Sequence, residues 1–117
     1  WEAAMSAGHY RLDNLTAIVD RNWVQIDGKT EDVMKLEPLA EKWKSFNWEV
    51  FECNGNNIEN LVMTFEKIMR SKGKPKVLIA ETMMGAGIPS IEGNNAWHGK
   101  APNKVEFEQF MEELNHE

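Results

Sequence analysis

The sequence is poor in cysteine, in histidine and in long apolar runs. Its 117 residues include one cysteine, Cys53, so an internal disulfide is excluded, and we expect a reducing, cytoplasmic setting with Cys53 as a small core residue. No apolar run approaches the roughly 20 residues of a membrane span, and no secretory signal is recognisable. The three histidines, His9, His98 and His116, are scattered, which gives no support to a zinc site.

The charge balance is acidic, with 13 basic and 19 acidic side chains and a net charge of -6. This balance argues against nucleic acid or an anionic membrane surface as the main partner, although a small anionic ligand remains compatible. A hydrophobic content of 42% is enough for the core of one domain. Five tryptophans, seven methionines and the abrupt start at Trp1 lead us to expect a piece of a longer polypeptide with apolar surface that meets other parts.

The periodicity of apolar residues alternates between helical and extended patterns. Helices are expected at 1–11, 36–46, 58–69 and 105–114, with Pro38 in a first turn, Asn57 as an N-cap and Gly73 as a stop signal. Strands are expected at 14–20 and 76–80, both buried on two faces, and at 48–53, exposed on one side. The remaining long segments, 21–35 and 83–103, are expected to be loops.

This order of elements predicts an α/β fold, a parallel sheet with helices on both faces. Only three strands are present, which is thin for a parallel sheet, so we expect an incomplete domain over residues 1–117. In such sheets ligands bind beyond the carboxyl ends of the strands. The segment after the first strand and the segment after the third strand are therefore the candidate sites.

The first candidate segment, residues 20–28, carries oxygen-bearing side chains at close spacing: Asp20, Asn22, Gln25 and Asp27. Hard cations such as Mg²⁺ or Ca²⁺ take oxygen ligands of this kind, with phosphates or water completing the shell. A plain polar turn explains the same residues, because Asn, Asp and Gly favour turns for local backbone reasons. From spacing alone the turn is the more common outcome.

The second candidate segment, residues 82–99, contains Gly85-Ala86-Gly87 and a later loop with His98 between Trp97 and Gly99. The glycines match neither a dinucleotide fingerprint nor a Walker loop, and a tight turn explains them. A histidine in this position can act as a general acid or base, or contact a phosphate, near neutral pH. An ordinary surface histidine is the competing interpretation.

Taken together, several of these segments closely resemble transketolase, and the similarity covers nearly the whole chain in order. The match is carried by residues 1–10 (Trp-Glu-Ala-Ala-Met-Ser-Ala-Gly-His-Tyr), 12–15, 20–28, 39–43 and 94–102 (Asn-Asn-Ala-Trp-His-Gly-Lys-Ala-Pro). The best match is the N-terminal subunit of the split, two-gene type. The resemblance implies a thiamine-diphosphate-binding fold and a transferase that passes a two-carbon ketol unit from a ketose phosphate to an aldose phosphate, as in the pentose phosphate pathway.

The resemblance also implies roles for particular residues. Thiamine diphosphate would be held through Mg²⁺ (or Ca²⁺), with the side chain of Asn22 and the main-chain carbonyl of Val24 as ligands. Ile26 would pack near the cofactor rings, and Met84 against the thiazolium. His98 would lie near the diphosphate and the donor sugar and handle a proton or stabilise charge. We therefore expect the Asn22 amide to point into the mouth of the sheet, close to His98.

One departure from the family pattern limits this chain. The Gly-Asp-Gly segment, which supplies an acidic Mg²⁺ ligand, would lie upstream of Trp1 and is absent from this sequence. The glutamate that activates the cofactor would belong to a C-terminal partner subunit carrying the pyrimidine-binding domain, in a dimer or heterotetramer. We expect the isolated 117 residues to be inactive. Other thiamine diphosphate enzymes (a deoxyxylulose-phosphate synthase or a 2-oxo acid dehydrogenase subunit) and a non-catalytic interaction module are the alternatives.

Overall fold

A computed structural model describes residues 1–115, so the prediction about His116 lies outside the described residues. The chain separates into two compact units. Unit 1 contains residues 1–21 and 36–81, and unit 2 contains residues 22–35 and those from Thr82 onward. None of the described helices combines the length and the apolar character needed to cross a membrane.

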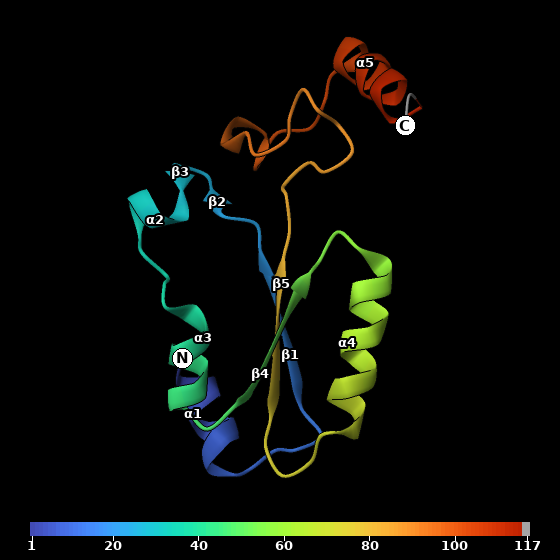
Figure 1. Ribbon diagram of the computed structural model, residues 1–117. Coiled ribbons are helices and arrows are strands. Elements are labelled where there is room, and N and C mark those ends of the chain that lie inside the picture. Colours follow the sequence, from blue (N-terminus) through green and yellow to red (C-terminus); the bar gives the residue numbers. More distant parts are fainter. Residues whose placement is uncertain (116–117) are drawn as a thin grey trace. The chain divides into compact units, whose positions relative to one another are not determined.

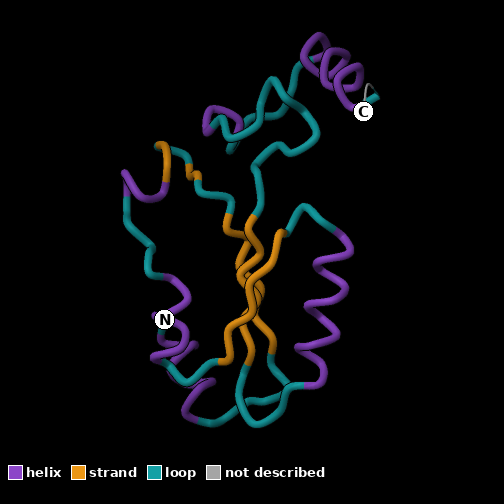
Figure 2. Tube along the Cα trace, in the orientation of Figure 1, coloured by secondary structure: helices purple, strands orange, loops and turns teal. Residues whose placement is uncertain are grey.

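Unit 1 is built on a sheet of three parallel strands (Figures 1 and 2). The order is β1 (Thr16–Arg21), β5 (Lys76–Glu81) and β4 (Glu49–Asn54), with β5 in the centre. The strands start and end in register, since Arg21 and Asn54 both lie opposite Glu81. This arrangement confirms the predicted α/β fold with a parallel sheet.

Helices cover both faces of this sheet, as the sequence predicts (Figure 1). Helices α1 (Glu2–His9) and α3 (Leu39–Ser45) pack on the face that carries Val77 and Ile79. Helix α4 (Ile58–Arg70) packs on the opposite face, over Leu78 and Ala80. The alternation follows from the two-residue period of a strand, which sends neighbouring side chains to opposite faces.

Local sequence signals explain where the helices of unit 1 begin and end. The side chain of Asn57 accepts a hydrogen bond from the Asn60 N–H at 2.9 Å, which confirms the predicted N-cap of α4. After Arg70 the chain turns through Gly73, whose φ of 87° favours glycine. Helix α3 begins at Leu39, later than predicted, because Pro38 occupies the N-cap position and disfavours helical backbone at the residue before it.

The prediction that the first strand is buried on both faces is wrong, whereas the same prediction for β5 is confirmed. Strand β1 is an edge strand of the described sheet, and its side chains alternate between exposed and less exposed, with Ile18 62% exposed. Strand β5 has neighbours on both sides, and all of its residues before Glu81 are buried. A continuous apolar run therefore does not distinguish an edge strand from a central one. Cys53 on β4 is half-buried against the cluster under α4.

Unit 2 contains short elements and one longer helix. They are β2 (Val24–Gln25), β3 (Gly28–Lys29), α2 (Thr30–Val33), a 3₁₀ turn η1 (Asn95–Trp97) and α5 (Lys104–Leu114). The expected loop at 21–35 is thus corrected to a hairpin followed by a single helical turn. The missed signal is Gly28, which pairs with Gln25 directly after the two-residue loop of Ile26 and Asp27 and has a φ of 140° that favours glycine.

The closing helix, predicted at 105–114, is confirmed as α5. Asn103 begins it with a capping box: its side chain accepts from the main-chain N–H groups of Val105 and Glu106, and the Glu106 carboxylate accepts from the Asn103 N–H. Phe110 is its buried residue, and Phe107 is 53% exposed. The helix is therefore fixed at its start by its own cap rather than by extensive burial.

Candidate functional site

The candidate site begins where two neighbouring parallel strands end. Strand β1 ends at Arg21 and continues into Asn22, whereas β5 ends at Glu81 and continues into Thr82. Arg21 and Glu81 lie opposite one another in the sheet. Both long segments of unit 2 thus start at the carboxyl edge of a parallel sheet, where open α/β folds bind their ligands.

A partly buried ion pair secures the end of β1. The Nε and Nη2 atoms of Arg21 lie 3.1 and 3.0 Å from Oε1 of Glu37, and only 3% of the Arg21 side chain is exposed. The second carboxylate oxygen of Glu37 accepts from the Leu39 N–H at 2.8 Å. The Leu39 N–H and then the Arg21 guanidinium hold the pKa of Glu37 below its usual range. No sequence pattern signals this pair, since 16 residues separate its members.

Asn22, the predicted side-chain ligand, forms a turn with Val24. Its Oδ1 atom accepts a hydrogen bond from the Val24 N–H at 3.1 Å. Trp23 between them has a φ of 66°, a left-handed conformation that permits this close return of the backbone. Asn22 is half-buried and Val24 is buried, so both are held in place.

The hairpin also directs the carbonyl of Val24, the second predicted ligand. The Trp23 carbonyl accepts from the Thr30 N–H at 2.9 Å, so it points across the hairpin. The Val24 N–H, on the other side of the same peptide plane, points away from Thr30 and reaches Asn22. In an extended strand the N–H and C=O of one residue point the same way, which turns the Val24 carbonyl toward the Asn22 side. One amide oxygen and one carbonyl oxygen on one side suit a hard cation.

Ile26 and Met84 lie in tight turns of unit 2. Ile26 is at the tip of the β2–β3 hairpin and is 71% exposed. Met84 is half-buried, and its carbonyl accepts from the Gly93 N–H at 2.9 Å. Gly85, the next residue along the chain, has a φ of 73°, which confirms the tight turn expected at Gly85-Ala86-Gly87. Their packing against cofactor rings stays a prediction.

The loop that carries His98 is anchored on α5. His98 is exposed and follows η1 directly, and its N–H donates to the Asn95 carbonyl at 3.0 Å. The Trp97 ring packs edge-on against Phe110, with centroids 5.0 Å apart. Lys100 places its Nζ 4.0 Å from the Trp97 ring centroid and 2.6 Å from a Glu106 carboxylate oxygen. The imidazole is therefore presented to solvent by a loop with fixed neighbours.

One hydrogen bond joins the two predicted segments of the site. The side-chain amide of Asn95 donates to the Ile26 carbonyl at 3.0 Å, across 69 positions of sequence. The structure thereby brings the His98 loop to the hairpin that follows Asn22. The expected closeness of the Asn22 amide to the His98 ring itself stays a prediction. Sequence reasoning missed the role of Asn95, which gave no signal beyond its place in the motif.

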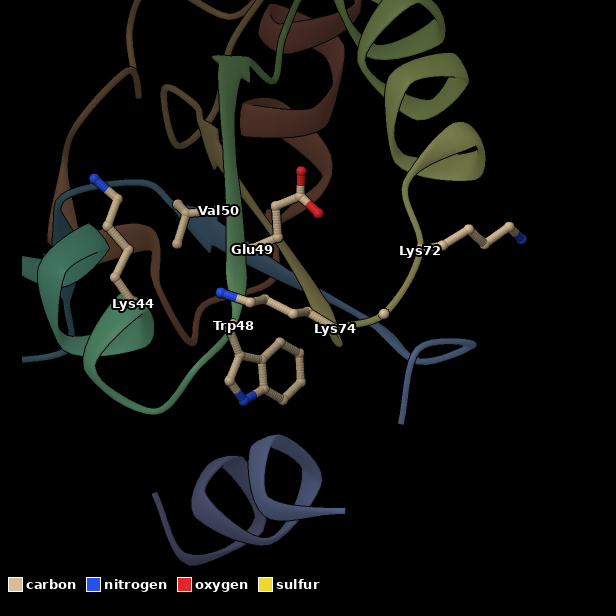
Figure 3. A pocket seen from close by; sticks show the side chains of 7 residues that line it. Lys44, Trp48, Glu49, Val50, Lys72 and Lys74 are labelled. Carbon is tan, nitrogen blue, oxygen red and sulfur yellow. The ribbon is translucent and has the colours of Figure 1, made fainter. Parts of the chain in front are cut away.

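A hollow lies elsewhere, at the amino ends of β4 and β5 (Figure 3). It measures about 620 Å³ and is lined by Trp48, Glu49 and three lysines, among other residues. Figure 3 shows Lys72 pointing away from the other labelled side chains, and Lys44 is paired with Glu41 at 2.6 Å. Because Lys72 points away and Lys44 is already paired, we assign no function to this hollow. Within residues 1–115, no three His, Cys, Asp or Glu side chains gather as metal ligands.

Comparison with protein families gives a match over the whole chain. The family described as "Transketolase, thiamine diphosphate binding domain" matches residues 1–117. An apulose-4-phosphate transketolase subunit of Actinobacillus succinogenes is 49% identical over 117 residues, which is 100% of this chain and 42% of that protein. A 6-deoxy-6-sulfo-D-fructose transketolase subunit of a Clostridium species is 39% identical, again over 100% of this chain and 42% of the relative.

Solved structures of transketolases share the fold. Transketolase from Campylobacter jejuni superposes with a TM-score of 0.88 at 27% identity, covering 97% of this chain and 18% of that protein. Transketolase from Pichia stipitis in complex with sedoheptulose-7-phosphate gives a TM-score of 0.86 at 27% identity, covering 97% of this chain and 17% of that protein. The chain thus spans less than half the length of the curated relatives and about a sixth of these solved transketolases.

Proposed function

We propose that the protein containing this chain transfers two-carbon ketol units from a ketose phosphate to an aldose phosphate. The premise is that this chain belongs to the transketolase family of thiamine diphosphate binding domains. The observation that carries the proposal is the family match over residues 1–117 together with the Asn22–Val24 turn at the carboxyl edge of the sheet. Thiamine diphosphate supplies the carbanion chemistry, and the protein supplies binding and orientation. Two relatives carry names of sugar-phosphate or sulfosugar transketolases, which supports the reaction class.

We assign the divalent cation, Mg²⁺ or Ca²⁺, to the Asn22 side chain and the Val24 carbonyl. The hydrogen bond from the Val24 N–H to the Asn22 side-chain oxygen holds these two residues together in one turn, which supports their assignment to one cation. Because a hard cation takes six or more oxygen ligands, the remaining ligands come from the cofactor diphosphate, from water and from residues outside this chain. The role of Asn22 and Val24 is then to hold the diphosphate on the hairpin that follows them.

The other site residues act on the reacting end of the cofactor and on the sugar. Ile26 and Met84 offer apolar surface on the hairpin tip and the Gly85 turn, where they exclude water from the rings. His98, exposed at the end of η1, holds or moves a proton near the donor sugar and the diphosphate. These roles require that both loops face the bound cofactor.

A second polypeptide completes the proposed enzyme. The similar proteins whose names describe one subunit of a transketolase imply a partner chain, which we expect to carry the pyrimidine-binding domain in a dimer or heterotetramer. A cytoplasmic location and a place in pentose phosphate metabolism fit this assignment. A half-site without its partner neither orients the substrate nor excludes water, so we expect residues 1–117 alone to be catalytically silent.

The experiment replaces the proposed ligand in the intact protein, assembled with its partner. Asn22→Ala should raise the Mg²⁺ concentration for half-maximal thiamine diphosphate binding by about 10-fold or more, measured by titration calorimetry. Asn22→Asp, which keeps an oxygen ligand, should bind more tightly than the alanine variant. Asn115→Ala removes an asparagine hydrogen bond at the other end of unit 2 and serves as the matched control.

Substrate assays decide the reaction class. The wild-type assembly should convert xylulose 5-phosphate with ribose 5-phosphate or a related pair of sugar phosphates, monitored by product chromatography. Turnover of pyruvate alone would instead identify a deoxyxylulose-phosphate synthase or a 2-oxo acid dehydrogenase subunit. Unchanged cation and cofactor affinities in Asn22→Ala would remove the metal assignment from this residue.

A further inference from the structure

Asn95 makes two contacts that no other described residue of the His98 loop combines. Its side-chain amide donates to the Ile26 carbonyl on the hairpin at 3.0 Å. Its own carbonyl accepts the His98 N–H at 3.0 Å. A single half-buried residue therefore holds the hairpin with its side chain and the histidine with its backbone.

We infer that Asn95 is a positioning residue, which fixes the distance between the His98 imidazole and the hairpin that carries Asn22, Val24 and Ile26. The inference rests on the proposed function, because it concerns how a proton-handling group is held relative to a cofactor-binding hairpin. An asparagine side chain has two torsions and a planar donor, so a bond to a fixed carbonyl restricts it strongly. Asn95 itself touches neither cofactor nor substrate in this assignment.

The rest of the loop is secured independently of Asn95. Trp97 packs on Phe110, and Lys100 joins the Trp97 ring to Glu106 on α5. Asn94 stabilises the start of η1 through its side chain, which accepts the Ala96 N–H at 3.1 Å. Loss of the Asn95 amide should therefore leave the loop folded on α5 and release it from the hairpin only. Positional freedom of this kind lowers turnover without unfolding the protein.

The chemistry of the bond sets the order of the variants. Asn95→Ala removes the donor and leaves the exposed hairpin tip to water. Asn95→Asp places a carboxylate oxygen against the Ile26 carbonyl oxygen, so two acceptors face each other and repel. The aspartate variant should be the more affected of the two, although it is nearly identical in size to the wild-type residue.

The first measurement is amide hydrogen exchange in the intact protein without cofactor. Residues 94–100 should exchange about 2- to 10-fold faster in Asn95→Ala, the range expected for loss of one hydrogen bond. Asn115→Ala is the matched control, because its side-chain amide also donates to a main-chain carbonyl, that of Met111, at 2.7 Å. The control should leave exchange at 94–100 unchanged. Equal exchange in Asn95→Ala and wild type overturns the inference.

The second measurement is a double-mutant cycle with His98→Ala on the assembled enzyme. Asn95→Ala should lower kcat/KM on the order of 10-fold in the wild-type background and less than about 2-fold when His98 is already alanine. An equal loss in both backgrounds overturns the inference, since Asn95 would then act without His98. A wild-type assembly that lacks ketol transfer altogether contradicts the proposed function instead, and the exchange result still decides whether Asn95 holds the loop.

Discussion

Glu37 tests how firmly the end of β1 is held before the chain enters the candidate site. Its carboxylate accepts from Arg21 and from the Leu39 N–H, whereas glutamine has only one acceptor oxygen for these two partners. Breaking a fully buried ion pair costs about 3–5 kcal/mol, but 42% of the Glu37 side chain is exposed, so water replaces part of the loss. We expect Glu37→Gln to destabilise the protein by about 2 kcal/mol, a fall of several degrees in Tm.

The matched control is Glu41→Gln on the same segment. Glu41 pairs with Lys44 at 2.6 Å, and both side chains are largely exposed, so its loss should cost below about 1 kcal/mol. The pKa of Glu37 is lowered in the folded protein, so its stabilising contribution is present above the ordinary pKa of about 4.3 and is lost as pH falls through the lowered value. The Tm difference between wild type and Glu37→Gln should therefore hold from about pH 7 to about pH 5 and shrink below about pH 4. A Glu37 variant no weaker than the Glu41 variant, or a difference that grows in acid, refutes the reasoning.

Further substitutions test the packing of unit 1 and the helix cap of α5 in unit 2. Gly8→Ala should destabilise unit 1 by about 2 kcal/mol or more, because the new Cβ would lie 1.9 Å from the Phe46 carbonyl oxygen. The cost of this overpacking outweighs the gain of about 1 kcal/mol from the higher helix propensity of alanine. Gly99→Ala, whose Cβ meets nothing within 4 Å, is the control in thermal unfolding, and equal Tm values for the two variants would contradict the clash. Asn103→Ala should lower the free energy of unfolding by about 1 kcal/mol and speed amide exchange in the first turn of α5. Asn103→Ser keeps a capping oxygen and should restore most of the protection from exchange. Unchanged exchange in both variants would show that the cap is dispensable.

The elements that the sequence predicts well are those with a local cause. Asn57 caps α4 through a neighbour three residues away, and the apolar run after Pro75 predicts the existence of strand β5. The α/β class follows from the alternation of such elements. The strand order and register, and with them the exposure of Ile18, depend on which strands are neighbours. Contacts between residues far apart in sequence decide this, so the sequence pattern does not predict it.

The candidate site shows the same division. The resemblance named Asn22, Val24, Ile26, Met84 and His98 as site residues, and all five lie in unit 2 on segments that follow adjacent strands. The contacts that support these residues could not be predicted, because they join partners far apart in sequence. Arg21 reaches Glu37 across 16 positions and Asn95 reaches Ile26 across 69, and neither pair has a spacing rule. A family resemblance thus identifies candidate site residues more readily than the distant partners that hold those residues in place.

The turn at Asn22 and the proposed cation site are compatible rather than competing explanations of one sequence. The amide oxygen has two lone pairs, and the Val24 N–H occupies one of them. The second is available to a cation, and the bond that forms the turn also fixes where that lone pair points. A residue chosen only to make a turn could be replaced by aspartate or serine at little cost. A residue that must also bring its oxygen to a cation while forming the turn cannot be replaced by serine, whose shorter side chain moves the oxygen back toward the main chain. Asn22→Ser should therefore preserve the folding of the hairpin and weaken Mg²⁺-dependent cofactor binding, and a serine variant with wild-type binding would show that the turn alone accounts for Asn22.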